Sequence, residues 1–214
     1  MERTLKVIAK GVKRVSADTV EIEFTVKAQD LSYDNMLKIS EEQLITMQNL
    51  VKKAGFEKKQ LRTQNYKIRT IYDNVKKKNG DYETVFSGYE CEQEFLLKFP
   101  MDIQRLNSVL KSIDICEVKP IFNIRFTLSN ARAAHDEALR DAAINARHEA
   151  ELITEASGVQ LGELLKIDMT SNNYGRLIMS EISTAPLSMG ETGIMQPDNI
   201  TVEASAKFIW EIKS

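Results

Sequence analysis

The stretch TVEIEFTVK, residues 19–27, decides which class of fold to expect, because apolar and polar side chains alternate along it. In an extended strand, successive side chains point to opposite faces, so one face of this strand is apolar and the other is polar. This pattern is typical of an antiparallel sheet that has one solvent face and one face covered by helices. The apolar face comprises Val20, Ile22, Phe24 and Val26.

The segments that follow predict one helix and two more strands. Apolar residues recur at helical spacing over roughly 31–54, which indicates a helix. Two strands are expected at 61–72 and 84–99, and the Asn79-Gly80 pair favours a turn between them. In the second of these strands, one face carries Tyr89, Cys91, Gln93, Phe95, Leu97 and Phe99.

The same order of elements recurs in the second half of the chain. A strand at 120–128, a helix at roughly 130–157, a strand candidate at 161–170 and a strand at 200–212 follow one another. We interpret the two halves as an internal repeat of strand–helix–strand–strand units; a chance similarity between two amphipathic patterns is the alternative. The equivalent positions are Phe24 and Phe126, Gly55 and Gly158, and the triplets Phe95, Leu97, Phe99 and Phe208, Trp210, Ile212.

The expected fold class is therefore α+β, with mainly antiparallel sheet packed by two long helices. A short helix at about 101–113 links the repeats, with Asp102 as its candidate N-cap, and a strand at about 3–10 precedes them. The whole chain is expected to form one domain. Its bounds are 1–214, with repeats at about 18–99 and 120–212 and an irregular loop at 171–199.

Composition and charge argue against several classes of protein. The chain has 214 residues, of which 43% are hydrophobic and 28% are charged, as in ordinary globular proteins with a substantial core. Its net charge of -2 gives no general attraction to nucleic acid or anionic lipid. No segment has the length and apolarity of a signal peptide or a transmembrane helix. As written, the chain is expected to be cytoplasmic; a periplasmic or exported protein whose leader was removed would read the same.

Both histidines lie in the second long helix beside acidic residues, which raises the question of a metal or acid–base site. On a regular helix, His135 borders the apolar stripe, whereas His148 lies roughly opposite and about 20 Å further along the axis. The two histidines therefore cannot bind one ion together, and we expect a solvated helix face with one packing histidine. The expected apolar stripe is Leu139, Ala142, Ala143, Ala146, Ala150 and Ile153.

Alanine recurs at every fourth position of this helix, from Ala134 to Ala150. Small side chains allow another element to approach a helix closely. The sequence leaves open whether that element is the sheet of the same chain or a neighbouring subunit.

Motifs of known catalytic chemistry are absent from the sequence, which has no Gly-x-Ser-x-Gly, no glycine-rich phosphate loop and no Cys-x-x-Cys. Cys91 and Cys116 fit no zinc spacing and are either buried thiols or one disulfide. Cys91 lies between Glu90 and Glu92, which disfavour a thiolate, so it is a poor nucleophile. We expect no catalytic residue, no metal ligand and no cofactor.

The lysines 76–78 lie near Tyr72 and Tyr82, a combination of charge and aromatic rings that nucleic-acid-binding proteins use. The tip of a solvated hairpin contains the same residue types. We favour the interpretation of these residues as the tip of a solvated hairpin, and we expect no nucleic-acid partner.

The loop 171–199 is too long for an ordinary connection and is unusually apolar. It either packs on its own chain or contacts a partner, and methionine-rich segments suit adaptable contacts. The candidate oligomer or partner contacts are Tyr174, Leu177, Ile178, Met179, Ile182, Leu187, Met189, Ile194 and Met195.

Four segments, taken in order, resemble the SIMPL domain family, which includes YggE-like bacterial proteins. They are VSADTVEIEFTV (15–26), AGFEKKQLRTQNYKIRTIYD (54–73), GYECEQEFLLKF (88–99) and the segment 129–167, which contains HDEALRDAAINARHEAEL. The chain departs from the family pattern in lacking a proline before Asp18 and in having His135 where tyrosine is common. The resemblance implies an α+β fold, ring-like homo-oligomers and no established catalytic activity. It also implies links to oxidative-stress tolerance in bacteria, and most bacterial members are exported.

We therefore expect a non-catalytic, self-assembling protein, either a stress-related or an envelope-associated scaffold or binding module. A homo-oligomer is the expected assembly, and a further protein partner stays open. One alternative is an enzyme with an unrecognised site between the repeats. The other is a nucleic-acid binder that uses the lysines 76–78.

Overall fold

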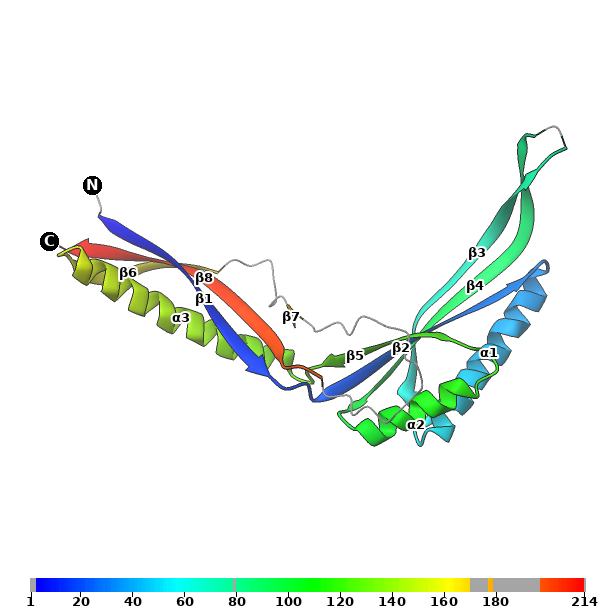
Figure 1. Cartoon of the computed structure of the whole chain (residues 1–214). Helices are drawn as coiled ribbons and strands as arrows, with labels where there is room; N and C mark the ends of the chain where they lie inside the picture. Colours follow the sequence, from blue (N-terminus) through cyan, green and yellow to red (C-terminus); the bar gives the residue numbers. More distant parts are fainter. Residues whose placement is uncertain (1–2, 79, 170–176, 179–196, 214) are drawn as a thin grey trace. The chain divides into compact units, whose positions relative to one another are not determined.

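The computed structural model describes residues 3–78, 80–169, 177–178 and 197–213 (Figure 1). Within this part of the chain, three α-helices accompany two antiparallel sheets, which confirms the expected α+β fold. The chain divides into two compact units. The first unit contains the N-terminal strand and most of the elements after residue 126, and the second unit contains the elements between residues 19 and 125. The single domain and the internal repeat stay predictions.

The second unit is built on a sheet with the strand order β3-β4-β2-β5. The alternating stretch of the sequence is its strand β2, and the four apolar side chains predicted to share a face are all buried. Phe24 lies opposite Phe95 and Ile22 lies opposite Leu97 in the antiparallel pairing of β2 with β4. The strands are β2 (Thr19–Asp30), β3 (Leu61–Lys76), β4 (Tyr82–Pro100) and β5 (Ile121–Thr127).

Two of the described α-helices belong to this unit. Helix α1 (Tyr33–Lys53) packs on β2 and β4 and buries Met36, Met47 and Val51. Helix α2 (Ile103–Asp114) begins at Asp102, whose carboxylate accepts hydrogen bonds from two backbone amides of the first turn. That contact confirms Asp102 as the N-cap.

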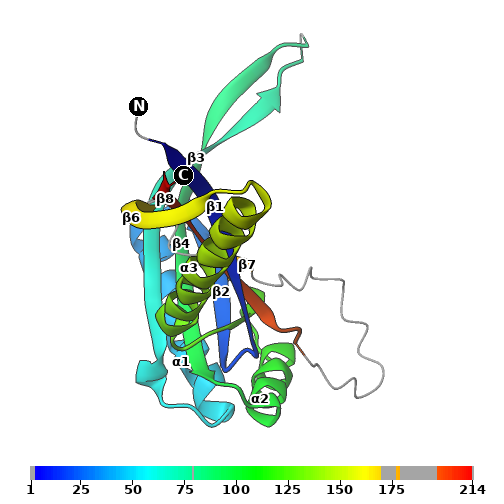
Figure 2. The same ribbon diagram turned by 90° about the vertical axis from the view of Figure 1, so that its left-hand side faces the viewer.

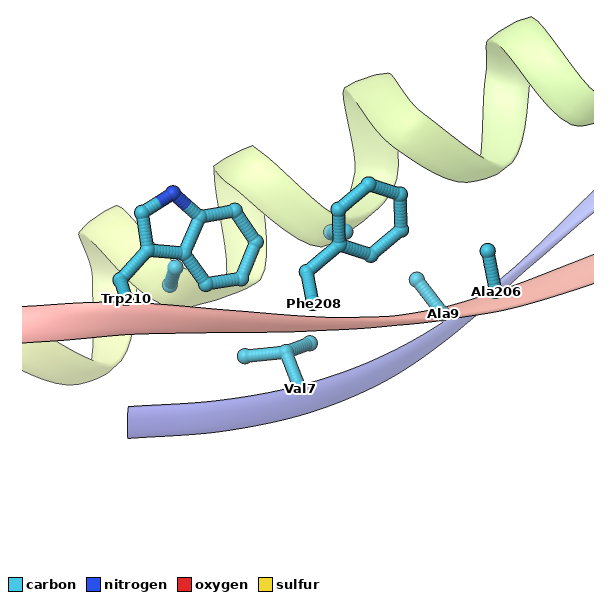
Figure 3. Packing of buried hydrophobic residues seen from close by; sticks show 7 residues of the cluster. Val7, Ala9, Ala206, Phe208 and Trp210 are labelled. Atoms are coloured by element: carbon cyan, nitrogen blue, oxygen red, sulfur yellow. The ribbon is translucent and has the colours of Figure 1, made fainter. Parts of the chain in front are cut away.

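The first unit has a sheet with the order β1-β8-β6, on which one long helix, α3, packs (Figure 1). Its core places Val7 and Ala9 of β1 beside Phe208 and Trp210 of β8, whose rings stack with centroids 5.5 Å apart (Figure 3). Strand β1 is longer than the predicted 3–10. The elements are β1 (Thr4–Val15), α3 (Ala131–Ala156), β6 (Gln160–Met169), β7 (Leu177–Ile178) and β8 (Ile200–Lys213).

The alanines of α3 face the sheet of their own chain, which answers the question that the sequence left open. All five, at every fourth position from Ala134 to Ala150, are buried. Strand β1 approaches so closely at Gly11 that a Cβ there would lie 1.9 Å from the carbonyl oxygen of Ala138. Glycine and the small side chains of α3 together make this contact between helix and strand.

The predicted apolar stripe of α3 is only partly right. Ala142, Ala146 and Ala150 are buried, and Leu139 is partly buried, but Ala143 and Ile153 are exposed. The buried line follows the i,i+4 ridge from the alanines to Thr154, and this ridge winds slowly around the helix. A helix that packs on a sheet along such a ridge leaves one side of a straight stripe in solvent.

Candidate functional site

The nine residues proposed as assembly contacts lie almost wholly outside the described part of the chain. Leu177 and Ile178 form β7, which pairs with β8 at Val202 and Thr201. Their role as contacts stays a prediction. The others, outside the described residues, are Tyr174, Met179, Ile182, Leu187, Met189, Ile194 and Met195.

The two histidines lie where the helical pattern predicts. His135 is partly buried, with Nδ1 3.9 Å from a carboxylate oxygen of Asp136, and His148 is exposed. Among the described residues, no group of three or more His, Cys, Asp or Glu side chains is placed to hold a metal ion.

Both cysteines are free, buried thiols, which decides between the two possibilities that the sequence left open. Cys91 packs under α1, where its Sγ lies 3.3 Å from the Ser40 hydroxyl. The Gln93 amide donates to both the hydroxyl and the backbone carbonyl of Ser40, at 2.7 and 2.8 Å. This buried polar group ties α1 to β4, and the thiol contacts a hydroxyl instead of a general base.

A second polar cluster lies on the opposite face of β4, around Glu90. Its carboxylate is buried, with 3% of the residue exposed, although the alternation of the strand places it on the solvent face. Arg69 donates to it from Nε and Nη2 at 2.7 and 2.6 Å, and Gln29 donates at 2.5 Å. Burial raises the pKa of Glu90, but the hydrogen bonds from Gln29 and Arg69 and the charge of Arg69 together hold it below its ordinary 4.5. The ionised pair joins β2, β3 and β4.

The hairpin of β3 and β4 extends past the end of α1 (Figures 1 and 2). We call residues 71–87 the hairpin arm. Its aromatic rings continue a row that begins in the core, with Tyr72 against Phe86 and Phe86 against Tyr89. The large apolar side chains exposed on the arm are Tyr72, Val75, Tyr82, Val85 and Phe86.

Charge on the hairpin arm is balanced. Its three lysines, 76–78, are matched by three acids, Asp73, Asp81 and Glu83. Lys77 forms an ion pair with Glu83 at 3.0 Å. A surface that attracts phosphate needs excess positive charge, so this arm does not favour nucleic acid.

Helix α3 contacts the two edge strands of the first unit's sheet, β1 and β6, to different extents. At β1, Asn145 donates to the backbone carbonyl of Lys10 at 2.9 Å, and Lys13 pairs with Glu137 at 2.5 Å. Helix α3 makes far less contact with β6. Among the described residues, β1 and β6 are both edge strands of this sheet. Strand β6, which α3 contacts less and which we call the open edge, exposes Leu164, Leu165, Ile167 and Met169.

A shallow hollow of about 300 Å³ lies beside this open edge, between α3, β6 and β8. Leu164 and Ile167 line it together with Phe208 and Trp210, and Arg147 is the charged residue at its rim. Arg147 is paired with Glu151 at 2.8 Å. The lining is mostly apolar and lacks converging polar groups, so it suits an apolar side chain better than a polar substrate.

Sequence analysis did not identify the open edge of β6, the burial of Glu90 or the close approach at Gly11. In the segment LKIDM, 165–169, apolar and charged residues alternate as in an ordinary half-buried strand, so the local pattern does not show that this edge is exposed. Glu90 has no local signal, because its partners come from two other strands.

None of the helices in the described part of the chain is long and apolar enough to cross a membrane. Two relatives are 23% identical to this chain over 185 residues, which cover 86% of this chain and 69% of each relative. Both are named 26 kDa periplasmic immunogenic protein, one from Brucella melitensis biotype 1 and one from Brucella abortus strain S19. The sequence profile of the SIMPL family matches residues 5–210. Because this match covers nearly the whole chain, the protein belongs to the SIMPL family, whose members are described as proteins of unknown function (DUF541).

Proposed function

We propose that this protein is a non-catalytic, self-assembling member of the SIMPL family that serves as an oligomeric scaffold or binding module. The observation that carries the proposal is the open edge of β6, with four large apolar side chains in solvent. Monomeric proteins rarely leave contiguous apolar patches or unprotected sheet edges exposed, because both promote association. The exposed side chains of the hairpin arm add a second surface of the same kind.

The polar clusters of the second unit support a non-catalytic role, because each is engaged in holding strands or helices together. The Glu90 carboxylate is buried and accepts hydrogen bonds from Arg69 and Gln29. The Cys91 thiol is buried against Ser40. A general acid or nucleophile needs access to a substrate, and these groups face the interior or their structural partners.

We also propose that the assembly works in the cell envelope and contributes to stress tolerance. The names of the two Brucella relatives support the periplasmic part of this proposal. Fractionation of the source cells tests it: the protein is expected in the periplasmic fraction, and recovery with the cytoplasmic markers would contradict it. A strain that lacks the gene is expected to survive peroxide less well than its complemented control.

The experiment that tests assembly is the solution mass of the full chain, measured by light scattering after size exclusion over about a hundredfold range of concentration. We expect a discrete oligomer of the 24.3 kDa chain whose mass falls on dilution. A mass equal to one chain at every concentration contradicts the proposed function.

A further inference from the structure

We infer that the assembly is made by antiparallel pairing of β6 with β6 of a second copy of this chain, so that the sheets of the two first units become continuous. This inference rests on the proposed function, since it requires self-association, and it names the surface and the partner. Addition of a strand to an open edge satisfies the unpaired backbone groups of both strands.

The choice of β6 over β1 follows from the position of α3. Asn145 donates to the backbone carbonyl of Lys10 and Glu137 pairs with Lys13, so α3 contacts β1 at two polar positions as well as through its alanines. Helix α3 makes far less contact with β6 in the described residues, and Ile167, near the C-terminal end of that strand, is 51% exposed. Strand β6 carries charged side chains on one face, Lys166 and Asp168, but on the other face it presents the exposed apolar side chains of Ile167 and Met169.

The residues of β6 are self-complementary when two copies pair antiparallel about Ile167. The pairing of β6 with β8 is irregular before Lys166 but regular from Lys166 to Met169, with Ile167 opposite Phe208 and Asp168 opposite Lys207. In this register each Ile167 faces its copy, and each Lys166 lies opposite the second copy's Asp168 on the other face. Within one chain Lys166 already pairs with Asp168 at 2.7 Å, and Lys207 lies 3.5 Å from the same carboxylate, so the second copy extends an existing ion-pair cluster. A shift by one residue in either direction loses both of these matches.

The hollow beside Trp210 gives this pairing a second contact. A two-fold axis through an antiparallel strand pair is perpendicular to the sheet, so both α3 helices lie on the same face of the joined sheet. Ile167 and Met169 lie opposite Phe208 and Ala206, so they are on the face that α3 covers. The two hollows then adjoin across the axis and are closed by these side chains. Trp210, the single tryptophan of the chain, lines each hollow and reports on it.

The first test compares Ile167→Lys with Ile8→Lys in the full chain. Ile167→Lys places two ammonium groups opposite each other at the axis, and juxtaposed like charges cost several kcal/mol, so the dissociation constant should rise about a hundredfold or more. Ile8→Lys makes the same change on β1, at a side chain that is 66% exposed, and should leave the mass unchanged. Acrylamide quenching of Trp210 should increase when wild type is diluted into single chains.

The second test does not depend on the stability of the lysine variant. In Ile167→Cys the two Cβ atoms should lie about 5 Å apart across the pair, close enough for a disulfide after small adjustment, so a mild oxidant should give a covalent dimer. Wild type should give none, because Cys91 and Cys116 are both buried. Ile8→Cys is the matched control. Lys166→Asp should weaken association, and its combination with Asp168→Lys should restore it.

The outcomes separate this inference from the proposed function. The pairing of β6 is overturned if wild type is oligomeric, Ile167→Lys has the same mass and Ile167→Cys gives no cross-link. The proposed self-assembly is then retained. A wild type that is a single chain at every concentration overturns both. Hydrogen exchange of the backbone amides tests the remaining alternative, in which residues of the same chain cover β6. In that case the protection of residues 164–169 does not change on dilution, and the inference fails.

Discussion

Replacement of Gly11 by alanine should strongly destabilise the first unit. The added Cβ would lie 1.9 Å from the Ala138 carbonyl oxygen and 2.4 Å from the Ala142 backbone nitrogen. Ordinary contact begins at 3.4 Å, so α3 has to move by about 1.5 Å from β1. Rotamer changes give no relief, because both obstructing atoms belong to the backbone of the helix.

The magnitude follows from what that movement disrupts. Overpacking in a core costs about 1–3 kcal/mol, and here it also separates the alanine ridge from the sheet, so we expect a loss of about 3 kcal/mol or more in the free energy of unfolding. Urea unfolding followed by fluorescence measures it, since Trp210 lies in the same core.

Two controls make the result specific. Ile8→Ala changes an exposed side chain on the same strand and should cost less than about 1 kcal/mol. Ala138→Gly should not rescue Gly11→Ala, because it leaves the obstructing carbonyl in place. A free energy of unfolding for Gly11→Ala within about 0.5 kcal/mol of the wild-type value would refute the close approach of β1 and α3.

Three further predictions concern the second unit and the long loop. Arg69→Met leaves the buried Glu90 carboxylate without its cation and should lower the free energy of unfolding in urea by about 1–3 kcal/mol. Lys67→Met changes an exposed residue of the same strand and should have little effect. Equal effects of the two substitutions contradict the proposed role of the pair. The folded-state pKa of Glu90 lies below 4.5, so the ionised carboxylate contributes its full stability above about pH 4.5. That contribution is lost as the pH falls through the folded-state pKa. Glu90→Gln should therefore flatten the dependence of the urea midpoint on pH in this window, and an unchanged slope counts against the ionised pair. Deletion of residues 174–195 should lower the oligomeric mass with the circular dichroism of the sheets retained, and an unchanged mass shows that the loop is not part of the interface.

The type of each element was predictable because it depends on neighbours along the chain. Alternation in residues 19–27 predicted β2 and its buried face, and helical spacing predicted α1 and α3 to within a few residues. The pattern also placed His135 at the border of the buried face and His148 in solvent. These properties need only the period of a helix or strand and the preference of apolar side chains for the interior.

The candidate surfaces were less predictable, because they depend on which elements meet. Periodicity assigned Glu90 to a solvent face, and only the pairing of β3 and β2 with β4 brings Arg69 and Gln29 over it. In the same way, the alanine ridge showed that something approaches α3 closely, and the partner proved to be β1 at Gly11.

By itself, the sequence determined the type of the main elements, the buried face of β2, the α+β class and the resemblance to the SIMPL family. The tertiary structure alone decided which strands lie at the edges of each sheet and which of them α3 contacts more. Strand β1 pairs with β8 from the far end of the chain, and β5 pairs with β2, so neither sheet order follows from the local pattern. The physical reason is range: side-chain periodicity reports on contacts a few residues apart, whereas an open edge is defined by strands and helices that the chain brings together from distant positions.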